Sequence, residues 1–298
     1  MLQVLTHNIL PVFAMLALGF GAGRVGWVGQ EEARTANRLA FMVFQLPLIF
    51  LLITSMDMAA VRFDAIGLYA GAEIVSATLA FVIARALKCQ TDEAFLLAMC
   101  VIFVNSLLYI GPIAVLIYGE TGAMPVTAIV TLDTVVTFSV FIIGMELING
   151  KTGLSGALRD LGRNPVLTTI VVSLAINLMG IPIAEPLENA ARFAGAAAPP
   201  LVLFVLGVFL SRYAITPTPL IVAITGLKLL GFPLVIWGGF QLFSPDNPWT
   251  DLFLLCAAGP SGAMAFSLAL LHGVRTDRIA PIIFWTSLLS IASLAWLA

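Results

Sequence analysis

The chain has 298 residues, of which 60% are hydrophobic and only 10% are charged, with a formal net charge of −2 and a mean hydropathy of +1.06. A water-soluble domain carries about a quarter charged residues, so this composition excludes a soluble protein and requires a lipid environment. At about 30 residues for each crossing with its loop, the length holds about ten membrane-spanning helices and leaves no room for a soluble domain.

Apolar runs separated by charged or turn residues predict where these helices lie. The predicted spans are residues 5–24, 35–56, 64–86, 92–119, 124–148, 164–182, 190–210, 217–240, 251–273 and 277–297. Asn164 followed by Pro165 is typical of a helix start, because proline fits the first helical turn. The sequence therefore predicts an all-α membrane protein with ten spans.

The basic residues lie mostly on one side of this predicted bundle. Only Arg62 and Arg192 fall in loops of the other side, and Lys228 lies inside a span. The remaining eleven are Arg24, Arg34, Arg38, Arg85, Lys88, Lys151, Arg159, Arg163, Arg212, Arg275 and Arg278. Because Lys and Arg concentrate in cytoplasmic loops, this bias predicts that both termini lie outside. One extra or missing span would reverse every later loop, so the bias also supports the count of ten.

Weak internal similarity suggests that the two halves are repeats. Pro47–Leu52 resembles Pro200–Val205 at an offset of 153 residues, and Gly119 matches Gly273 at an offset of 154. Five spans in each half make the halves inverted relative to one another. We therefore expect two inverted five-helix repeats, residues 1–150 and 151–298, a construction of secondary transporters that place their site at the midplane.

Two spans contain matching interruptions near mid-membrane. Span 4 carries Asn105 and Ser106 before Gly111-Pro112, and the corresponding part of span 9 reads Gly259-Pro260-Ser261-Gly262. Proline removes a backbone donor and unwinds the preceding turn. Backbone freed in this way must line an enclosed or wet cavity. A half-helix that starts there directs the positive end of its dipole at the midplane, which suits a carboxylate.

Ionisable residues inside the spans mark the same region. Glu73 lies near the middle of span 3 and Lys228 near the middle of span 8, at nearly equivalent positions of the two repeats. Charged groups at this depth are costly and occur mostly in pairs or polar cavities. Glu73 is a candidate proton or cation site, and Lys228 a candidate counter-charge for an anionic substrate. Asp133, in the outer half of span 5, is a weaker candidate.

No sequence motif indicates other chemistry. The chain has no HExxH, GxSxG, phosphate-binding glycine loop or basic tract, so neither an enzyme nor a nucleic-acid-binding protein is expected. We expect no cofactor and no metal ion.

Several stretches, taken in order, resemble the auxin efflux carrier family over essentially the whole chain. They are Ile9–Phe13, Gly19, Glu31–Arg34, Asn105–Ser106 to Gly111–Pro112 with Gly119, Pro200–Gly207, and Pro260–Gly262 with Phe266. The family includes plant auxin carriers and bacterial members linked to small dicarboxylates such as malonate and malate. It shares its general fold with bile-acid sodium symporters.

This resemblance implies a scaffold of spans 1, 2, 6 and 7 and a transport domain of spans 3–5 and 8–10. Spans 4 and 9 would cross at their broken centres, and the transport domain would slide like an elevator against the scaffold. Glu73 matches a position where plant members carry an aspartate. A homodimer formed through the scaffold is also implied. Only about 15 residues separate spans 5 and 6, which favours a compact bacterial carrier.

The predicted function is secondary active transport of a small organic anion, a carboxylate such as malonate, malate or an auxin-like acid, across the plasma (inner) membrane. Its predicted partners are the anion and membrane lipid, with the coupling ion, proton or sodium, left open. The predicted substrate-binding residues are Asn105, Ser106, Tyr109, Gly111, Pro112, Gly259, Pro260, Ser261 and Met264. Among them, Pro112 and Pro260 shape the crossing. Glu73, Lys228 and Asp133 are predicted to set charge and coupling. The alternatives are a sodium-coupled symporter of the bile-acid type and a membrane sensor that does not transport.

Overall fold

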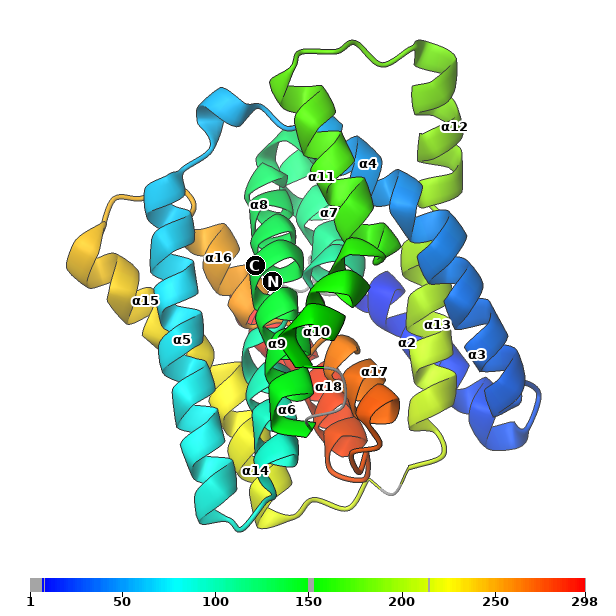
Figure 1. The fold of residues 1–298 in the computed structure, drawn as a ribbon, viewed down its shortest axis with the longest axis vertical. Helices are drawn as coiled ribbons and strands as arrows, with labels where there is room; N and C mark the ends of the chain where they lie inside the picture. Colours follow the sequence, from blue (N-terminus) through cyan, green and yellow to red (C-terminus); the bar gives the residue numbers. More distant parts are fainter. Residues whose placement is uncertain (1–6, 8, 150–152, 214, 298) are drawn as a thin grey trace.

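A computed structural model describes residues 7, 9–149, 153–213 and 215–297 as a bundle of helices (Figure 1). Within these ranges the only strand-like pairing is an isolated bridge between Val104 and Ser261. The prediction of an all-α chain is therefore confirmed. Lys151 and the predicted boundary between the two repeats lie outside the described residues.

The helices follow one another along the chain with short connections. The first half contains α2 (Leu10–Val25), α3 (Gln30–Leu39), α4 (Gln45–Thr54), α5 (Phe63–Ala86), α6 (Thr91–Ile102), α7 (Gly111–Gly122), α8 (Met124–Leu132) and α9 (Phe138–Asn149). The second half contains α10 (Gly153–Gly162), α11 (Pro165–Leu178), α12 (Glu185–Gly195), α13 (Ala198–Leu210), α14 (Pro219–Gly226), α15 (Phe232–Phe243), α16 (Thr250–Ala257), α17 (Met264–His272) and α18 (Ile279–Leu297). Short segments join or interrupt them: the π-helical turns η2 (Ala40–Phe44), η4 (Ser106–Ile110), η5 (Asp133–Thr137) and η6 (Leu227–Gly231), and the 3-10 turn η3 (Met58–Ala60).

Several of the predicted spans correspond to long, continuous helical stretches in the structure. In the described part of the chain, six stretches are long and apolar enough to span a membrane: Gln30–Thr54, Phe63–Ala86, Met124–Asn149, Glu185–Leu210, Pro219–Phe243 and Ile279–Leu297. Shorter apolar helices cover Leu10–Val25, Ser106–Gly119 and Pro165–Leu178. Helix occupies part of each predicted span, but the count of ten crossings stays a prediction. The helix α10 lies in the link between spans 5 and 6, where the sequence did not predict one.

Local sequence explains several of the helix ends. Asn164 caps α11, because its Oδ1 accepts hydrogen bonds from the backbone amides of Val166 (2.9 Å) and Leu167 (3.3 Å). Pro165 stands in the first turn, where its missing amide proton costs nothing. The predicted start at Asn164-Pro165 is therefore confirmed.

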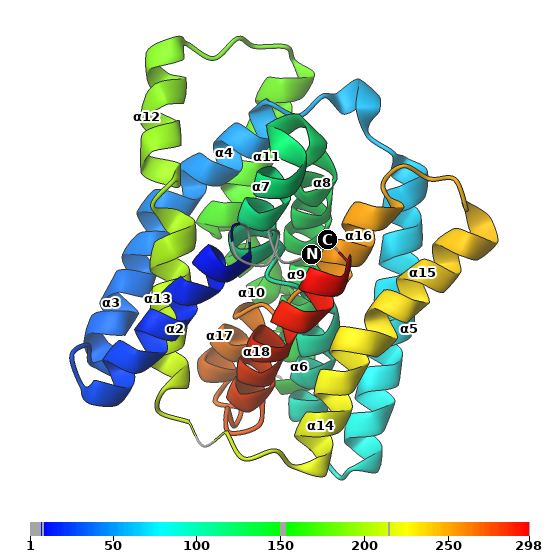
Figure 2. The ribbon, with the colours of Figure 1, turned by 180° about the vertical axis from the view of Figure 1, so that it is seen from behind.

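The helices form two groups. One contains α2, α3, α4, α11, α12 and α13, which pack on one another; the other contains α5 to α10 and α14 to α18. Figure 1 shows the first group on the right and top, α5 and α15 on the left and α14 at the bottom, and Figure 2 shows the same separation from behind. The groups meet where α13 packs against η4 and α11 packs against η5.

Small residues bring α2 and α13 into close contact. A Cβ atom added at Gly19 would overlap the carbonyl of Phe204, and one at Gly207 would overlap the carbonyl of Leu16. Each helix therefore needs glycine where the other backbone passes, which is the packing that small residues allow between membrane helices.

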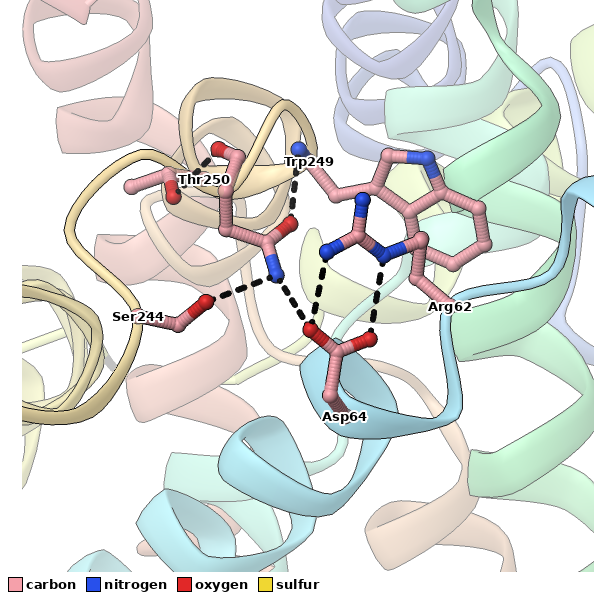
Figure 3. Close-up of polar contacts among 6 residues, drawn as sticks. Arg62, Asp64, Ser244, Trp249 and Thr250 are labelled. Carbon is pink, nitrogen blue, oxygen red and sulfur yellow. Dashed lines mark hydrogen bonds and ion pairs between the residues drawn. The ribbon is translucent and has the colours of Figure 1, made fainter.

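A polar cluster ties the start of α5 to the segment that precedes α16 (Figure 3). The Asp64 carboxylate accepts hydrogen bonds from Nε (3.1 Å) and Nη2 (3.0 Å) of Arg62 and from Nδ2 of Asn247 (3.0 Å). Asn247 in turn accepts from the Trp249 amide at 3.1 Å through Oδ1 and from the Thr250 hydroxyl at 2.8 Å through its carbonyl. These bonds hold the first residue of α16 against α5.

Candidate functional site

The first interruption lies between α6 and α7. The helix α6 ends at Ile102, Phe103 is extended with φ −78° and ψ 97°, and Asn105 has φ −76° and ψ 56°. The π-helical turn η4 then leads into α7, whose first turn holds Pro112. The chain therefore unwinds before Pro112, as its sequence predicts. The non-helical residues, 103–105, lie about two helical turns before Pro112.

The second interruption lies between α16 and α17, and the two interruptions pair with each other. The Asn105 amide donates to the Pro260 carbonyl (3.0 Å), and the Gly262 amide donates to the Phe103 carbonyl (2.8 Å). This antiparallel pairing explains how the backbone stays satisfied away from water, since each break supplies the other's partners. Glycine at position 262 favours this close approach, because a Cβ atom there would lie 2.9 Å from the Phe103 ring and 3.1 Å from the Phe103 carbonyl oxygen.

Side chains satisfy the carbonyls at the ends of the two half-helices. The Ser261 hydroxyl donates to the Cys100 carbonyl (2.6 Å), near the end of α6. Lys228 Nζ donates to the carbonyl of Ala257 (2.6 Å), and the Ser293 hydroxyl donates to the carbonyl of Ala258 (3.0 Å). The final carbonyls of a helix have no intrahelical donor, and a cation there also suits the dipole. Lys228 is thus the cationic cap of α16.

A cavity of about 230 Å³ adjoins the pairing and lies between the two helix groups. Its polar wall residues include Gln45, Asn105, Ser106, Asp133 and Thr134. The rest of the wall is largely apolar: Phe41, Met42, Phe103, Val104, Leu107, Leu108, Val130, Phe138, Asn164, Pro165, Val166, Val202, Gly262, Ala263 and Met264. In the described part of the chain, Gln45 Oε1 and Ser106 Oγ are buried and have no hydrogen-bond partner. Two residues of the cavity wall therefore have a buried side-chain oxygen whose hydrogen-bonding capacity is unused.

Two helices begin at this cavity. Ser106, Leu107 and Leu108 open η4, and Ala263 and Met264 stand at the start of α17; all five line the cavity. The first amides of a helix have no intrahelical acceptor. Two positive helix ends therefore meet one cavity, which is an arrangement that suits an anion.

The structure separates the predicted site residues into three sets. Asn105, Ser106, Met264 and Asp133 line the cavity. Gly111 and Pro112 instead line a neighbouring apolar cavity of about 380 Å³, which shares Leu107 and Val130 with the first.

The remaining predicted residues lie outside both cavities. Tyr109 is fully buried in the core, and Gly259 packs against Ile110. Pro260 is occupied in the pairing through its carbonyl. Ser261 is the bridge partner of Val104, and its amide donates outside the pairing, to Thr286 Oγ1 of α18 at 3.2 Å. Sequence analysis missed Gln45 and Thr134, because a lone polar residue in an apolar span carries no pattern.

Glu73, Asp133 and Lys228 form a buried charged cluster behind the cavity. Their side chains come from α5, η5 and η6, and the residues are 4%, 2% and 0% exposed. Glu73 Oε2 accepts a hydrogen bond from Thr137 Oγ1 (3.0 Å), and all three groups interact electrostatically. Lys228 Nζ also lies 5.1 Å from the centre of the Phe232 ring. Of the three, only Asp133 reaches the cavity wall, so it connects the cavity with the other two charges.

Comparison with known proteins gives one family and two relatives. A family model described as "Membrane transport protein" matches residues 4–297. An uncharacterized transporter of Methanothermobacter thermautotrophicus is 26% identical over 299 residues, covering 97% of this chain and 96% of the relative. A putative malonate transporter of Rhizobium meliloti is 26% identical over 305 residues, covering 98% of this chain and 94% of the relative.

Proposed function

The chain belongs to the membrane transport protein family, the family of the auxin efflux carriers, and on that premise we propose that it is a secondary active transporter of a small organic anion. One observation carries the choice of an anion: the starts of η4 and α17 meet at a single cavity. A carboxylate bound there accepts hydrogen bonds from helix-start amides and from the side chains of Asn105 and Ser106.

The wall charges favour an anion with one carboxylate. No Lys, Arg or His is found among the described residues that line the cavity, and Asp133 contributes an acid. A second carboxylate would lack a cation and would be repelled by Asp133. The apolar cavity next to it offers room for an apolar body. Among malonate, malate and an auxin-like acid, these features favour the last; the relative named as a putative malonate transporter supports the carboxylate class.

The buried cluster offers a route to proton coupling. Two carboxyl groups and one ammonium carry a net charge of −1 when all are ionised, and one bound proton makes the cluster neutral. Protonation removes the repulsion between Asp133 and an entering carboxylate, so proton and substrate favour each other's binding. Glu73 stores the proton, and Lys228 acts on the substrate through Asp133 rather than by contact.

Repeating backbone features support ten spans in two inverted repeats, residues 1–150 and 151–298. Among the described glycines, four have positive φ: Gly26, Gly119, Gly180 and Gly273. They form two pairs with one offset, since 180 − 26 and 273 − 119 both equal 154. Gly26, Gly180 and Gly273 stand at helix ends, and Gly119 kinks α7 near its end. With the bias of basic residues, this layout puts both termini outside the plasma membrane.

The position of the cavity supports an elevator mechanism. Gln45, Asn164 and Val202 line it from one helix group, and Asn105, Asp133 and Met264 line it from the other. If the first group is the fixed scaffold of a homodimer, sliding of the second carries the bound anion across the membrane while the paired breaks move as one body.

Two other functions remain as competitors. A sodium-coupled symporter of the bile-acid type needs several oxygen ligands close to the crossing. The described cavity wall offers Asp133, Asn105, Ser106 and Gln45 for this purpose. A sensor would use the same cavity to bind an anion without moving it.

Uptake by proteoliposomes containing the purified protein tests the proposal. Radiolabelled monocarboxylates with an apolar body, malonate and malate are compared in sodium-free buffer with and without an imposed pH gradient. We expect saturable uptake of a monocarboxylate that a pH gradient drives without sodium. Uptake that needs sodium would favour the symporter, and binding without uptake would favour the sensor.

A further inference from the structure

An apolar groove lies between α14–α15 and α18, on the side of the molecule that faces the viewer in Figure 2. Its volume is about 1110 Å³. Exposed Val222, Leu230 and Leu234 line one side, and Leu289 and Trp296 line the other. Both sides belong to stretches long and apolar enough to cross a membrane. The groove of a multi-pass membrane protein at this position faces hydrocarbon.

The inside of the groove offers little to a polar ligand. Thr225 and Ser293 are its hydroxyl-bearing wall residues, and the Ser293 hydroxyl already donates to the Ala258 carbonyl. Gly226 keeps the groove open, because a Cβ atom added there would meet no described atom within 4 Å. The exposed residues of the groove wall are apolar.

We infer that this groove binds one acyl chain of a membrane phospholipid. Its wall on α18 runs from Trp285 to Leu297, a rise of about 18 Å at 1.5 Å per residue, and one leaflet of the hydrocarbon core is about 15 Å thick. The groove is therefore as long as a chain of a single leaflet.

The acyl chain packs against residues that support the crossing. Leu254 of α16 and Ser293 line the groove, and Ser293 also holds the carbonyl of Ala258, at the interruption after α16. The bound lipid is thus part of the packing that fixes the end of α16, where Lys228 holds the preceding carbonyl, that of Ala257.

Fluorescence quenching by brominated lipid tests this site. One variant keeps Trp285, a half-buried groove residue, as the only tryptophan, and a control variant keeps Trp249, which is buried outside the groove; the others become phenylalanine. Both are reconstituted in phospholipid with or without bromine on the acyl chains. We expect brominated lipid to quench Trp285 and to leave Trp249 unchanged. Equal, weak quenching of both would overturn the proposal.

A substitution that fills the groove distinguishes quenching by an acyl chain bound in the groove from quenching by the surrounding bulk lipid. Gly226→Leu fills the groove, whereas Gly238→Leu places the same side chain on α15 outside it, where a Cβ atom also meets no described atom within 4 Å. Gly226→Leu should remove the quenching of Trp285 and the phospholipid adduct seen by native mass spectrometry, and Gly238→Leu should keep both. Quenching that persists in Gly226→Leu, or cross-links between two copies at the groove, would contradict the proposal. Because neither readout is transport, failure here leaves the proposed transport function standing.

Discussion

Lys228 Nζ donates a 2.6 Å hydrogen bond to the carbonyl oxygen of Ala257, the last residue of α16. The ammonium group therefore serves two demands at once: it satisfies a carbonyl at a broken helix end, and it offsets the charge of Glu73 and Asp133. The first demand arises from the break, because a continuous helix would have no such carbonyl to satisfy.

Lys228→Ala should abolish transport while expression is retained. The substitution leaves the Ala257 carbonyl and the two acids without their cation, at a cost of about 1–3 kcal/mol for the unsatisfied group. Uptake by proteoliposomes and a thermal unfolding curve measure the two effects. Lys88→Ala, which removes an exposed lysine, is the matched control and should change neither. Full transport by Lys228→Ala would refute the role of Lys228 in charge balance.

Asp133→Asn should make transport insensitive to pH. In the wild type, acidification on the substrate side adds the proton that removes the negative charge of the cluster, so uptake should rise as pH falls. Asp133 interacts electrostatically with four titratable groups on neighbouring elements: Tyr69 and Glu73 on α5, Lys228 on η6 and Cys256 on α16. Asparagine removes one negative charge from the cluster, as the bound proton does in the wild type, so substrate should bind at any pH but a pH gradient should no longer drive accumulation.

The control for that experiment is Asp246→Asn, which neutralises an exposed acid. It should keep the wild-type pH profile. A profile that stays steep in Asp133→Asn would show that the coupling proton binds elsewhere.

Gly19→Leu should destabilise the protein, whereas Gly21→Leu should be tolerated. A side chain at position 19 would overlap the Phe204 carbonyl, but at position 21 no described atom lies within 4 Å. Forcing α2 away from α13 costs about 1–3 kcal/mol or more. Thermal unfolding in detergent compares the two variants; equal melting temperatures would mean that these helices do not pack through Gly19.

Asn247→Ala should loosen the start of α16. The substitution removes the bonds to Asp64 and to the Trp249 amide and leaves the Arg62–Asp64 pair in place. Hydrogen exchange of α16 amides should become faster, while exchange in α13, in the other helix group, stays unchanged. Unaltered exchange in α16 would show that other packing fixes this helix.

The sequence predicts the breaks well because their cause is local. Proline and glycine act on their own turn of helix, so Pro112 and Pro260 mark the interruptions without any knowledge of the fold. Glu73 and Lys228 are likewise visible as charges in apolar runs. The resemblance to the auxin efflux carriers is confirmed by the family match over residues 4–297.

Contacts between residues that lie far apart in the sequence could not be predicted in the same way. Gln45 reaches the cavity from the other helix group, and nothing near it in sequence distinguishes it from a packed polar residue. Ser261 looks like a ligand for substrate, yet its hydroxyl is used by the Cys100 carbonyl. Asp133 ranks below Glu73 and Lys228 by depth along its helix, but it alone of the three lines the cavity. These outcomes depend on how distant helices meet.

The most direct test of the central claim compares two buried hydroxyls. Ser106 lines the cavity and Ser173 does not; within the described residues, neither hydroxyl has a hydrogen-bond partner. A hydrogen bond to a charged group contributes about 1.5–3 kcal/mol, so Ser106→Ala should weaken binding of the transported carboxylate by roughly tenfold or more. Isothermal titration of purified protein should give this loss for Ser106→Ala and wild-type affinity for Ser173→Ala. Equal affinities in both variants would contradict a carboxylate site at the paired breaks.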